Sequence, residues 1–280
     1  LLWSVIDRRR LHYQRAMAWL RVYTRYYLAY MLFIYGIIKI YHLQMPTPAL
    51  YRLAEPYGNF SPMGVLWSFI GVSKAYSAFS GWAEVLGGAL LLFRRTTLLG
   101  ALVSFAVMVH VFVLNMCYDV PVKLFSFFLV LACIFLIVPE LGRLAKFFFL
   151  QQPTFSVLEK PLFIQRKWNI AAIVLKFGVI GWMLYSNISG CIEGQKEYGD
   201  RSMPAPLAGI YKVQSFERNG AVVPPLLTDS TLWNKLLVHN YPEGWGRITM
   251  ANEKLAYCTF KVDSVAHQID LHPVRDTLPN

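Results

Sequence analysis

The chain has 280 residues, of which 56% are hydrophobic and 15% are charged, and its formal net charge at pH 7 is +11. With a mean hydropathy of +0.40, this composition indicates an integral membrane protein rather than a soluble domain. The surplus of positive charge does not indicate nucleic-acid binding, because the basic residues of the soluble part are not interleaved with aromatic residues.

Five apolar stretches are long enough to cross a hydrocarbon core of about 30 Å as helices. They cover residues 24–42, 79–93, 97–117, 122–139 and 168–187. Backbone groups in lipid must be hydrogen-bonded within their own segment, so helices are expected. The sequence therefore predicts an all-α membrane bundle of four helices over 24–146, a connector over 147–167 and a fifth transmembrane helix over 168–187.

The distribution of basic residues predicts the orientation. Thirteen lysines and arginines lie before or at the start of the first stretch, between the second and third, and between the fourth and fifth, against three in the alternate loops or at the start of the fourth stretch. Because basic loops stay in the cytoplasm, the N-terminus and the connector should be cytoplasmic. Residues 1–23, with Trp3, Trp19 and Tyr23 beside the arginines, predict a basic interfacial helix.

After the fifth stretch, residues 188–280 predict a small antiparallel β-domain outside the cytoplasm. Apolar residues alternate from Gly209 to Arg218, and Asn219-Gly220 is a strong hairpin signal. Further strands are expected at 233–239, 247–251, 255–263 and 268–272. An eight-stranded, lipocalin-like barrel needs more strands than these. We therefore expect an open sheet, or a chain that stops before the domain does.

Ionisable residues inside apolar stretches are costly, so their depth is informative. Counting 1.5 Å per residue places Lys39, Glu84, His110, Asp119 and Lys123 in one band near the outer ends of the first four helices. One interpretation is a polar pocket that opens outward, in which Lys39 contacts Glu84. The alternative is a packing pair, Lys39 with Glu84, and an interfacial turn that carries Asp119 and Lys123.

Other residues give weaker signals. No second histidine follows His110 at helical spacing, so no metal site is predicted. Lys176, in the fifth stretch, could face the bundle or a partner subunit. Cys117 and Cys191 both fall at the outer face, where a disulfide could form, whereas Cys258 alternates with apolar residues and is expected in the sheet core.

Short motifs lie along residues 20–150, namely Gly81-Trp82-Ala83-Glu84, Gly87-Gly88, Arg94-Arg95, Gly100, Asn115 and Tyr118-Asp119-Val120-Pro121-Val122-Lys123. With these motifs, residues 20–150 resemble DoxX-like bacterial membrane proteins. It implies a four-helix bundle in the bacterial inner membrane and an association with thiol or redox processes. A fifth helix and a β-domain make this a long form. The sequence has no paired cysteines of the CxxC type to support sulfur chemistry.

Two functions remain open. The first is a redox-associated membrane subunit that binds a quinone or another small amphipathic molecule, which leaves the cofactor unknown. Its ligand-binding candidates are Lys39, Glu84, His110, Asp119, Lys123, Tyr35 and Trp82. The second is a non-enzymatic accessory subunit of a larger cell-envelope complex. Both place the chain among membrane lipids and other membrane subunits, and whether it is an enzyme stays undecided.

Overall fold

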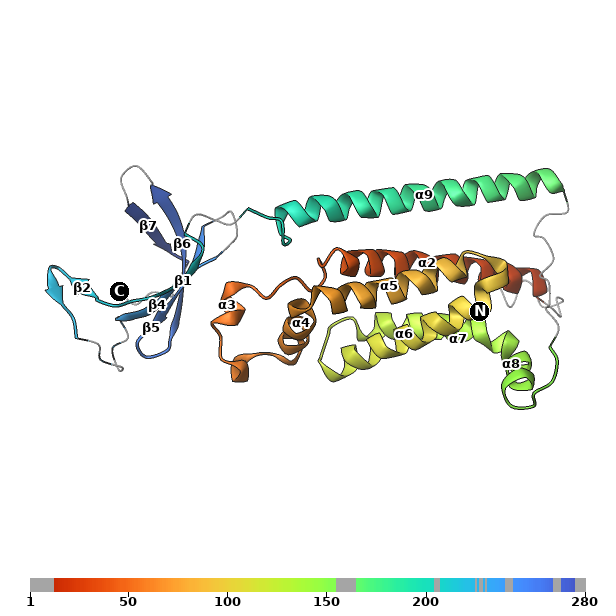
Figure 1. The fold of residues 1–280 in the computed structure, drawn as a ribbon, viewed down its shortest axis with the longest axis horizontal. Helices are drawn as coiled ribbons and strands as arrows, with labels where there is room; N and C mark the ends of the chain where they lie inside the picture. The colour runs from red at the N-terminus through yellow and green to blue at the C-terminus, as the bar shows by residue number, and fades with distance from the viewer. Residues whose placement is uncertain are drawn as a thin grey trace, which may run out of the picture. The chain divides into compact units, whose positions relative to one another are not determined.

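The computed structural model describes residues 13–154, 165–203, 207–224, 226, 229, 231–239, 244–263 and 268–274. The chain is mostly helical and ends in an antiparallel β-sheet (Figure 1). It divides into two compact units, Leu1–Gln44 with Lys74–Ile192, and Met45–Ser73 with Glu193–Asn280. The predicted combination of a helical part and a small β-domain is therefore confirmed.

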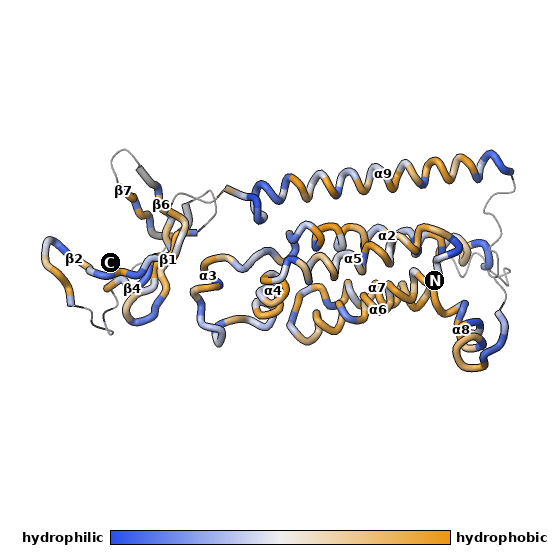
Figure 2. The backbone as a smooth tube through the Cα atoms, viewed as in Figure 1, coloured by the Kyte–Doolittle hydropathy of each residue, from blue (hydrophilic) through white to orange (hydrophobic). Residues whose placement is uncertain are grey.

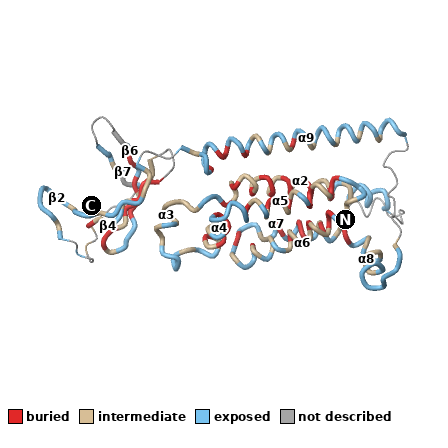
Figure 3. The backbone as a smooth tube through the Cα atoms, in the orientation of Figure 1, coloured by how far each residue is buried: buried red, intermediate tan, exposed pale blue. Residues whose placement is uncertain are grey.

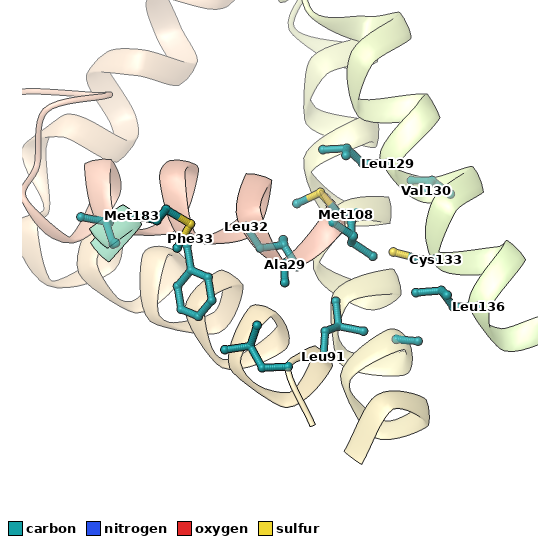
Figure 4. Packing of buried hydrophobic residues seen from close by; sticks show 14 of the residues in the cluster. Ala29, Leu32, Phe33, Leu91, Met108, Leu129, Val130, Cys133, Leu136 and Met183 are labelled. Carbon is teal, nitrogen blue, oxygen red and sulfur yellow. The ribbon is translucent and has the colours of Figure 1, made fainter. Parts of the chain in front are cut away.

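Four helices of the first unit pack around one hydrophobic core. They are α2 (Gln14–Ile40), α5 (Lys74–Leu91), α6 (Thr97–Cys117) and α7 (Lys123–Ile137), and α2 contacts both α5 and α7 while α6 contacts both α5 and α7. Figure 4 shows side chains of this core, among them Leu32, Leu91, Met108 and Cys133, directed toward one another. The unit also contains α8 (Leu141–Phe148) and most of α9 (Arg166–Glu197).

Among the described residues, three helical segments are long and apolar enough to cross a membrane, namely Arg94–Cys117, Lys123–Phe148 and Arg166–Glu197. Their hydrophobic residues dominate α6 and α7 in Figure 2. Two further predicted spans fall in α2 and α5, which are helical but less apolar. The reason is composition: α2 carries Arg15, Arg21, Arg25 and Lys39, and α5 carries Glu84 with several glycines and serines.

Several predicted boundaries differ from the structure. The helix α2 passes through residue 23 without a break, so there is no separate interfacial helix from 14 onward; residues 1–12 lie outside the described part of the chain. The prediction that the β-domain begins at 188 is wrong, because α9 continues to Glu197. Polar helix-forming residues such as Gln195 and Lys196 extend it past its apolar segment. Within the connector, residues 155–164 are not described.

The second unit contains an antiparallel sheet of five strands in the order β1-β4-β5-β6-β7. Its strands are β1 (Gly209–Lys212), β4 (Trp233–Val238), β5 (Trp245–Met250), β6 (Leu255–Asp263) and β7 (Gln268–Pro273). Among the described residues β1 and β7 are the edges, so the sheet is open. The predicted hairpin forms as β2 (Glu217–Arg218) and β3 (Ala221–Val222), where Asn219 and Gly220 both adopt positive φ.

Alternate residues of the sheet form a small core. Ile248, Met250, Ala256 and Cys258 are almost fully buried, which confirms the predicted position of Cys258. Burial raises the pKa of the Cys258 thiol, so this group stays protonated and unreactive. At the start of β5, Gly244 has φ +58°, and a Cβ there would lie 2.2 Å from the carbonyl oxygen of Phe260. Only glycine fits this position.

The segment between α2 and α5 belongs with the sheet. It forms α3 (Leu50–Leu53), a 3-10 turn at Tyr57–Asn59 and α4 (Pro62–Val72). The buried Arg247 on β5 donates a hydrogen bond from Nη2 to the carbonyl oxygen of Tyr51, 3.2 Å away. The ring of Tyr51 lies 5.4 Å from that of His239 and 6.4 Å from that of Trp245, measured between centroids. An aromatic and charged contact thus joins this segment to the sheet.

Candidate functional site

The helices α2 and α5 bring Lys39 and Glu84 together inside the first unit. Lys39 Nζ donates a hydrogen bond to Glu84 Oε1 and forms a salt bridge with it. The side chain of Lys39 is 7% exposed and that of Glu84 is not exposed at all. The predicted contact between these two residues is confirmed. A charge at this depth would be costly alone, and each side chain supplies the counter-charge for the other.

Glycines on both helices make this approach possible. A Cβ on Gly81 would lie 2.4 Å from the carbonyl oxygen of Gly36, and a Cβ on Gly36 would lie 2.7 Å from that of Gly81. The backbones of α2 and α5 are therefore in direct contact, one turn from the ion pair. Ser77 Oγ adds a cross-helix hydrogen bond of 2.9 Å to the carbonyl oxygen of Lys39. The Lys39 backbone and side chain are both anchored to α5.

Two buried polar atoms near the pair lack hydrogen-bond partners among the described residues, and one of them is the second carboxylate oxygen of Glu84 itself. Glu84 Oε2 and Ser104 Oγ are buried and form no hydrogen bond with any described residue. They lie on neighbouring helices, α5 and α6, which approach so closely that a Cβ on Gly87 would lie 2.6 Å from Ser104 Oγ. A buried acceptor without a donor costs roughly 1–3 kcal/mol. The two charges of the pair therefore neutralise each other, but Glu84 Oε2 lacks a hydrogen-bond donor among the described residues.

Asp119 and Lys123 form a second, separate ion pair at the turn between α6 and α7. Lys123 Nζ donates to Asp119 Oδ1, and the Asp119 side chain is 79% exposed. Asp119 adopts φ +54°, which turns the chain out of α6. The hydrogen bond and the charge of Lys123 hold the pKa of Asp119 below its usual value. This pair matches the predicted interfacial turn.

The remaining ligand-binding candidates are not enclosed with Lys39 and Glu84. His110 lies on an exposed face of α6, and Trp82, next to the buried face of α5, is 60% exposed. Tyr35 is half-buried and packs against the ring of Phe125, with centroids 5.8 Å apart. His110 and Trp82 are therefore not buried with Lys39 and Glu84, because depth along a helix does not fix the direction in which a side chain points. Their contact with a ligand stays a prediction.

The predicted disulfide between Cys117 and Cys191 is wrong, because both thiols are free. Cys117 is exposed at the end of α6. Cys191 is 5% exposed and belongs to the hydrophobic cluster of the first unit, because α9 remains helical there. No group of three or more His, Cys, Asp or Glu side chains that could hold a metal ion occurs within the described residues.

Sequence reasoning missed several buried polar contacts. Asn115 Nδ2 donates to Ser126 Oγ at 3.0 Å between α6 and α7, and Ser77 is fully buried. Arg25 on α2 is 5% exposed, although it falls in a segment whose basic residues were expected at the membrane surface. Serine and asparagine at the spacing of a buried helix face were the available signal. For Arg25, the heptad-like spacing to Leu32 and Lys39 was the only hint.

These features define a class: a helical bundle closed by a buried Lys–Glu pair, with three segments that could cross a membrane, and a separate antiparallel sheet. No family model and no solved structure matches the chain. Over 115 residues it is 33% identical to a Bacillus subtilis (strain 168) protein named "Uncharacterized protein YwoB". That match covers 40% of this chain and 71% of the relative. The chain therefore belongs to the family of YwoB.

Proposed function

We propose that the chain is a multi-pass protein of a bacterial inner membrane. Three segments have the length and composition of spans, and α2 and α5 share their core. The charge asymmetry of the loops favours a cytoplasmic N-terminus and a sheet on the periplasmic side. In this orientation Lys39 and Glu84 lie in the outer half of the bundle, and Arg25 lies in the inner half.

Within this bundle we propose a binding site for one small amphipathic molecule at Lys39 and Glu84. The observation that carries the proposal is Glu84 Oε2, which is buried and accepts no hydrogen bond from a described residue. A hydroxyl group on a ligand satisfies this oxygen, and the apolar part of the ligand lies against the surrounding helices. Ser104 Oγ, also without a described partner, offers a second polar contact on α6.

The chemistry of the pair suits a quinone or quinol head group. The ammonium group of Lys39 donates to a carbonyl oxygen, and the carboxylate of Glu84 accepts from a hydroxyl group. The resemblance to DoxX-like proteins supports a redox-associated ligand of this kind. Because the Glu84 side chain has no exposed surface, the ligand reaches it only when the helices around it separate locally.

Titration of the purified protein with a short-chain quinol analogue tests this proposal. Wild-type protein in mild detergent should bind the analogue saturably, and Glu84→Gln should bind it at least about ten-fold more weakly, which is the effect of one charge-assisted hydrogen bond. Asp119→Asn is the matched control, because it removes a carboxylate from an exposed pair. Equal binding by wild type and Glu84→Gln would contradict the proposal.

A second candidate is an accessory subunit of a larger envelope complex, favoured by the surface of α9. Figure 3 shows most of this helix in the exposed colour, with buried residues toward its C-terminal end, and its apolar segment is covered by little of the chain. Lipid or a partner helix covers such a surface. Native mass spectrometry after gentle extraction discriminates the two. A stoichiometric protein partner without a bound small molecule supports the accessory role, and a co-purifying quinone supports the ligand site.

A further inference from the structure

Two basic side chains, Arg25 of α2 and Lys176 of α9, contact the segment where α5 ends and α6 begins. Arg25 Nη1 donates to Thr97 Oγ1 at 3.3 Å, and its Nη2 donates to the hydroxyl of Tyr26 at 3.1 Å. Lys176 Nζ, from α9, donates to the carbonyl oxygen of Leu92. Arg21 lies one turn before Arg25 on α2, with its Nε buried. These contacts bring Arg25 and Lys176 to the segment 92–97, with Arg21 one helical turn away along α2.

A shared aromatic ring shows that two of these charges are close together. Arg25 Cζ lies 4.8 Å from the ring centroid of Tyr26, and Lys176 Nζ lies 5.8 Å from the same centroid. Lys176 Nζ also lies 4.8 Å from the ring centroid of Phe93. Aromatic faces attract cations, but they do not neutralise them. The two positive charges therefore repel each other across Tyr26 unless an anion lies nearby.

No described carboxylate supplies that anion. Arg21, Arg25 and Lys176 form no salt bridge with any described residue, and the hydrogen bonds of Arg25 and Lys176 go to hydroxyl and carbonyl groups. The Nε atoms of Arg21 and Arg25 are buried and lack an acceptor in the described chain. Arg25 is 5% exposed, so bulk water does not compensate it either. Buried charges are normally paired, and this cluster is paired with nothing that the described chain provides.

We propose that Arg21, Arg25 and Lys176 form a binding site for the phosphate group of an anionic phospholipid. Guanidinium groups bind phosphate oxygens with two N–H donors, and an ammonium group adds a point charge. The apolar surroundings fit acyl chains, since Phe93, Leu99 and Phe177 are each about half exposed. Two more arginines, Arg94 and Arg95, lie exposed on the same segment and add positive potential.

In the proposed orientation this site faces the cytoplasmic leaflet, which carries anionic lipids. The inference rests on the proposed membrane placement of the helices, but it is independent of any ligand at Glu84. Release of the protein from membranes without detergent would contradict the membrane placement itself. If the protein needs detergent for extraction but does not bind anionic lipid, only this inference is contradicted.

The test is thermal unfolding of the full chain in detergent with added phosphatidylglycerol, phosphatidylcholine or inorganic phosphate. Phosphatidylglycerol should raise the unfolding midpoint saturably, and the other two should not. Arg25→Gln and Lys176→Gln should each weaken the apparent affinity for phosphatidylglycerol about ten-fold or more. Lys176→Gln also guards against an Arg25 variant that fails to fold, because Lys176 is only partly buried.

Exposed basic residues provide the matched controls. Arg15→Gln on α2 and Lys146→Gln on α8 each remove one exposed positive charge and should leave the lipid affinity unchanged. Loss of affinity that is equal in all four variants would show general charge attraction and overturn the site. Unchanged affinity in both Arg25→Gln and Lys176→Gln would overturn it as well. If inorganic phosphate alone raises the unfolding midpoint, and this rise depends on Arg25, the ligand of the site is a free anion and the lipid proposal is overturned.

Discussion

The two ends of the helical bundle treat buried positive charge differently. Toward the end of α2, Lys39 is paired with Glu84 on α5. Four turns earlier on the same helix, Arg25 is equally buried but contacts only hydroxyl groups and a ring among the described residues. The positive charge of Lys39 is thus neutralised by a carboxylate of the chain, whereas no described carboxylate neutralises that of Arg25. At the Lys39 end the chain supplies the counter-charge, and at the Arg25 end we propose that a bound anion supplies it.

The largest effect is expected when the buried pair is broken. Lys39→Met or Glu84→Gln alone leaves one buried charge without a counter-charge, which should destabilise the bundle by about 3–5 kcal/mol. The double variant removes both charges and should lose less stability than either single one. Thermal or denaturant unfolding in a single detergent, arranged as a double-mutant cycle, measures the coupling.

A double-mutant cycle in which the two single losses of stability simply add would contradict this account of the pair.

The variant Arg25→Met tests the other end of the bundle. Because Arg25 has no carboxylate partner among the described residues, its removal strands no negative charge. We expect a smaller loss than for Lys39→Met, measured with the same unfolding assay in lipid-free detergent.

A smaller effect is expected from the glycine contact that positions the pair. Gly81→Ala places a Cβ 2.4 Å from the carbonyl oxygen of Gly36, so α2 and α5 must move apart at a cost of about 1–3 kcal/mol. Gly178→Ala in α9 is the matched control, because its Cβ would meet no described atom within 4 Å. It should be neutral or slightly stabilising. Equal unfolding midpoints for both variants would show that the close approach is unimportant.

Depth counting along the sequence predicted the Lys39–Glu84 contact, because antiparallel neighbours place equal depths side by side. It could not predict that His110 and Trp82 point outward, since rotation about a helix axis depends on tertiary packing. The Asn219-Gly220 turn predicted the β2–β3 hairpin, although that hairpin forms a separate two-stranded sheet. The association of residues 45–73 with the sheet could not be predicted, because it rests on contacts between Tyr51, Trp245 and Arg247 that are distant in sequence.

Acidification should distinguish the second unit from the bundle. Burial lowers the pKa of His239, so the folded state favours neutral imidazole, whereas the unfolded chain titrates near about 6.5. Stability from this group is therefore present above pH 6.5 and is lost as the pH falls below it. Two arginines, Arg52 and Arg247, contact Tyr51, whose ring packs against that of His239, so an added positive charge on His239 is further disfavoured there.

The fluorescence of Trp245, whose ring centroid lies 5.5 Å from that of His239, reports this change. The unfolding midpoint of the second unit should fall modestly between pH 7.5 and pH 5, and His239→Phe should flatten that dependence. A wild-type protein whose midpoint is the same at both pH values would argue against a buried neutral His239.

The smallest effect is expected at the exposed ion pair. Asp119→Asn removes the same kind of charge as Glu84→Gln, but its side chain is 79% exposed, so water screens the lost contact. The unfolding midpoint should not change measurably. A loss comparable to that of Glu84→Gln would mean that burial does not explain the contrast between the two pairs.

The central claim is that the Lys39–Glu84 end of the bundle faces the periplasm and the Arg25–Lys176 end faces the cytoplasm. It is tested most directly by labelling single reporter cysteines with a membrane-impermeant maleimide, in a Cys117→Ser background that removes the exposed native thiol. Glu253→Cys, on the exposed turn after β5, should react in intact spheroplasts, and Lys146→Cys on α8 should react only after the membrane is permeabilised. The opposite pattern, or equal labelling of both sites in intact spheroplasts, would contradict the account.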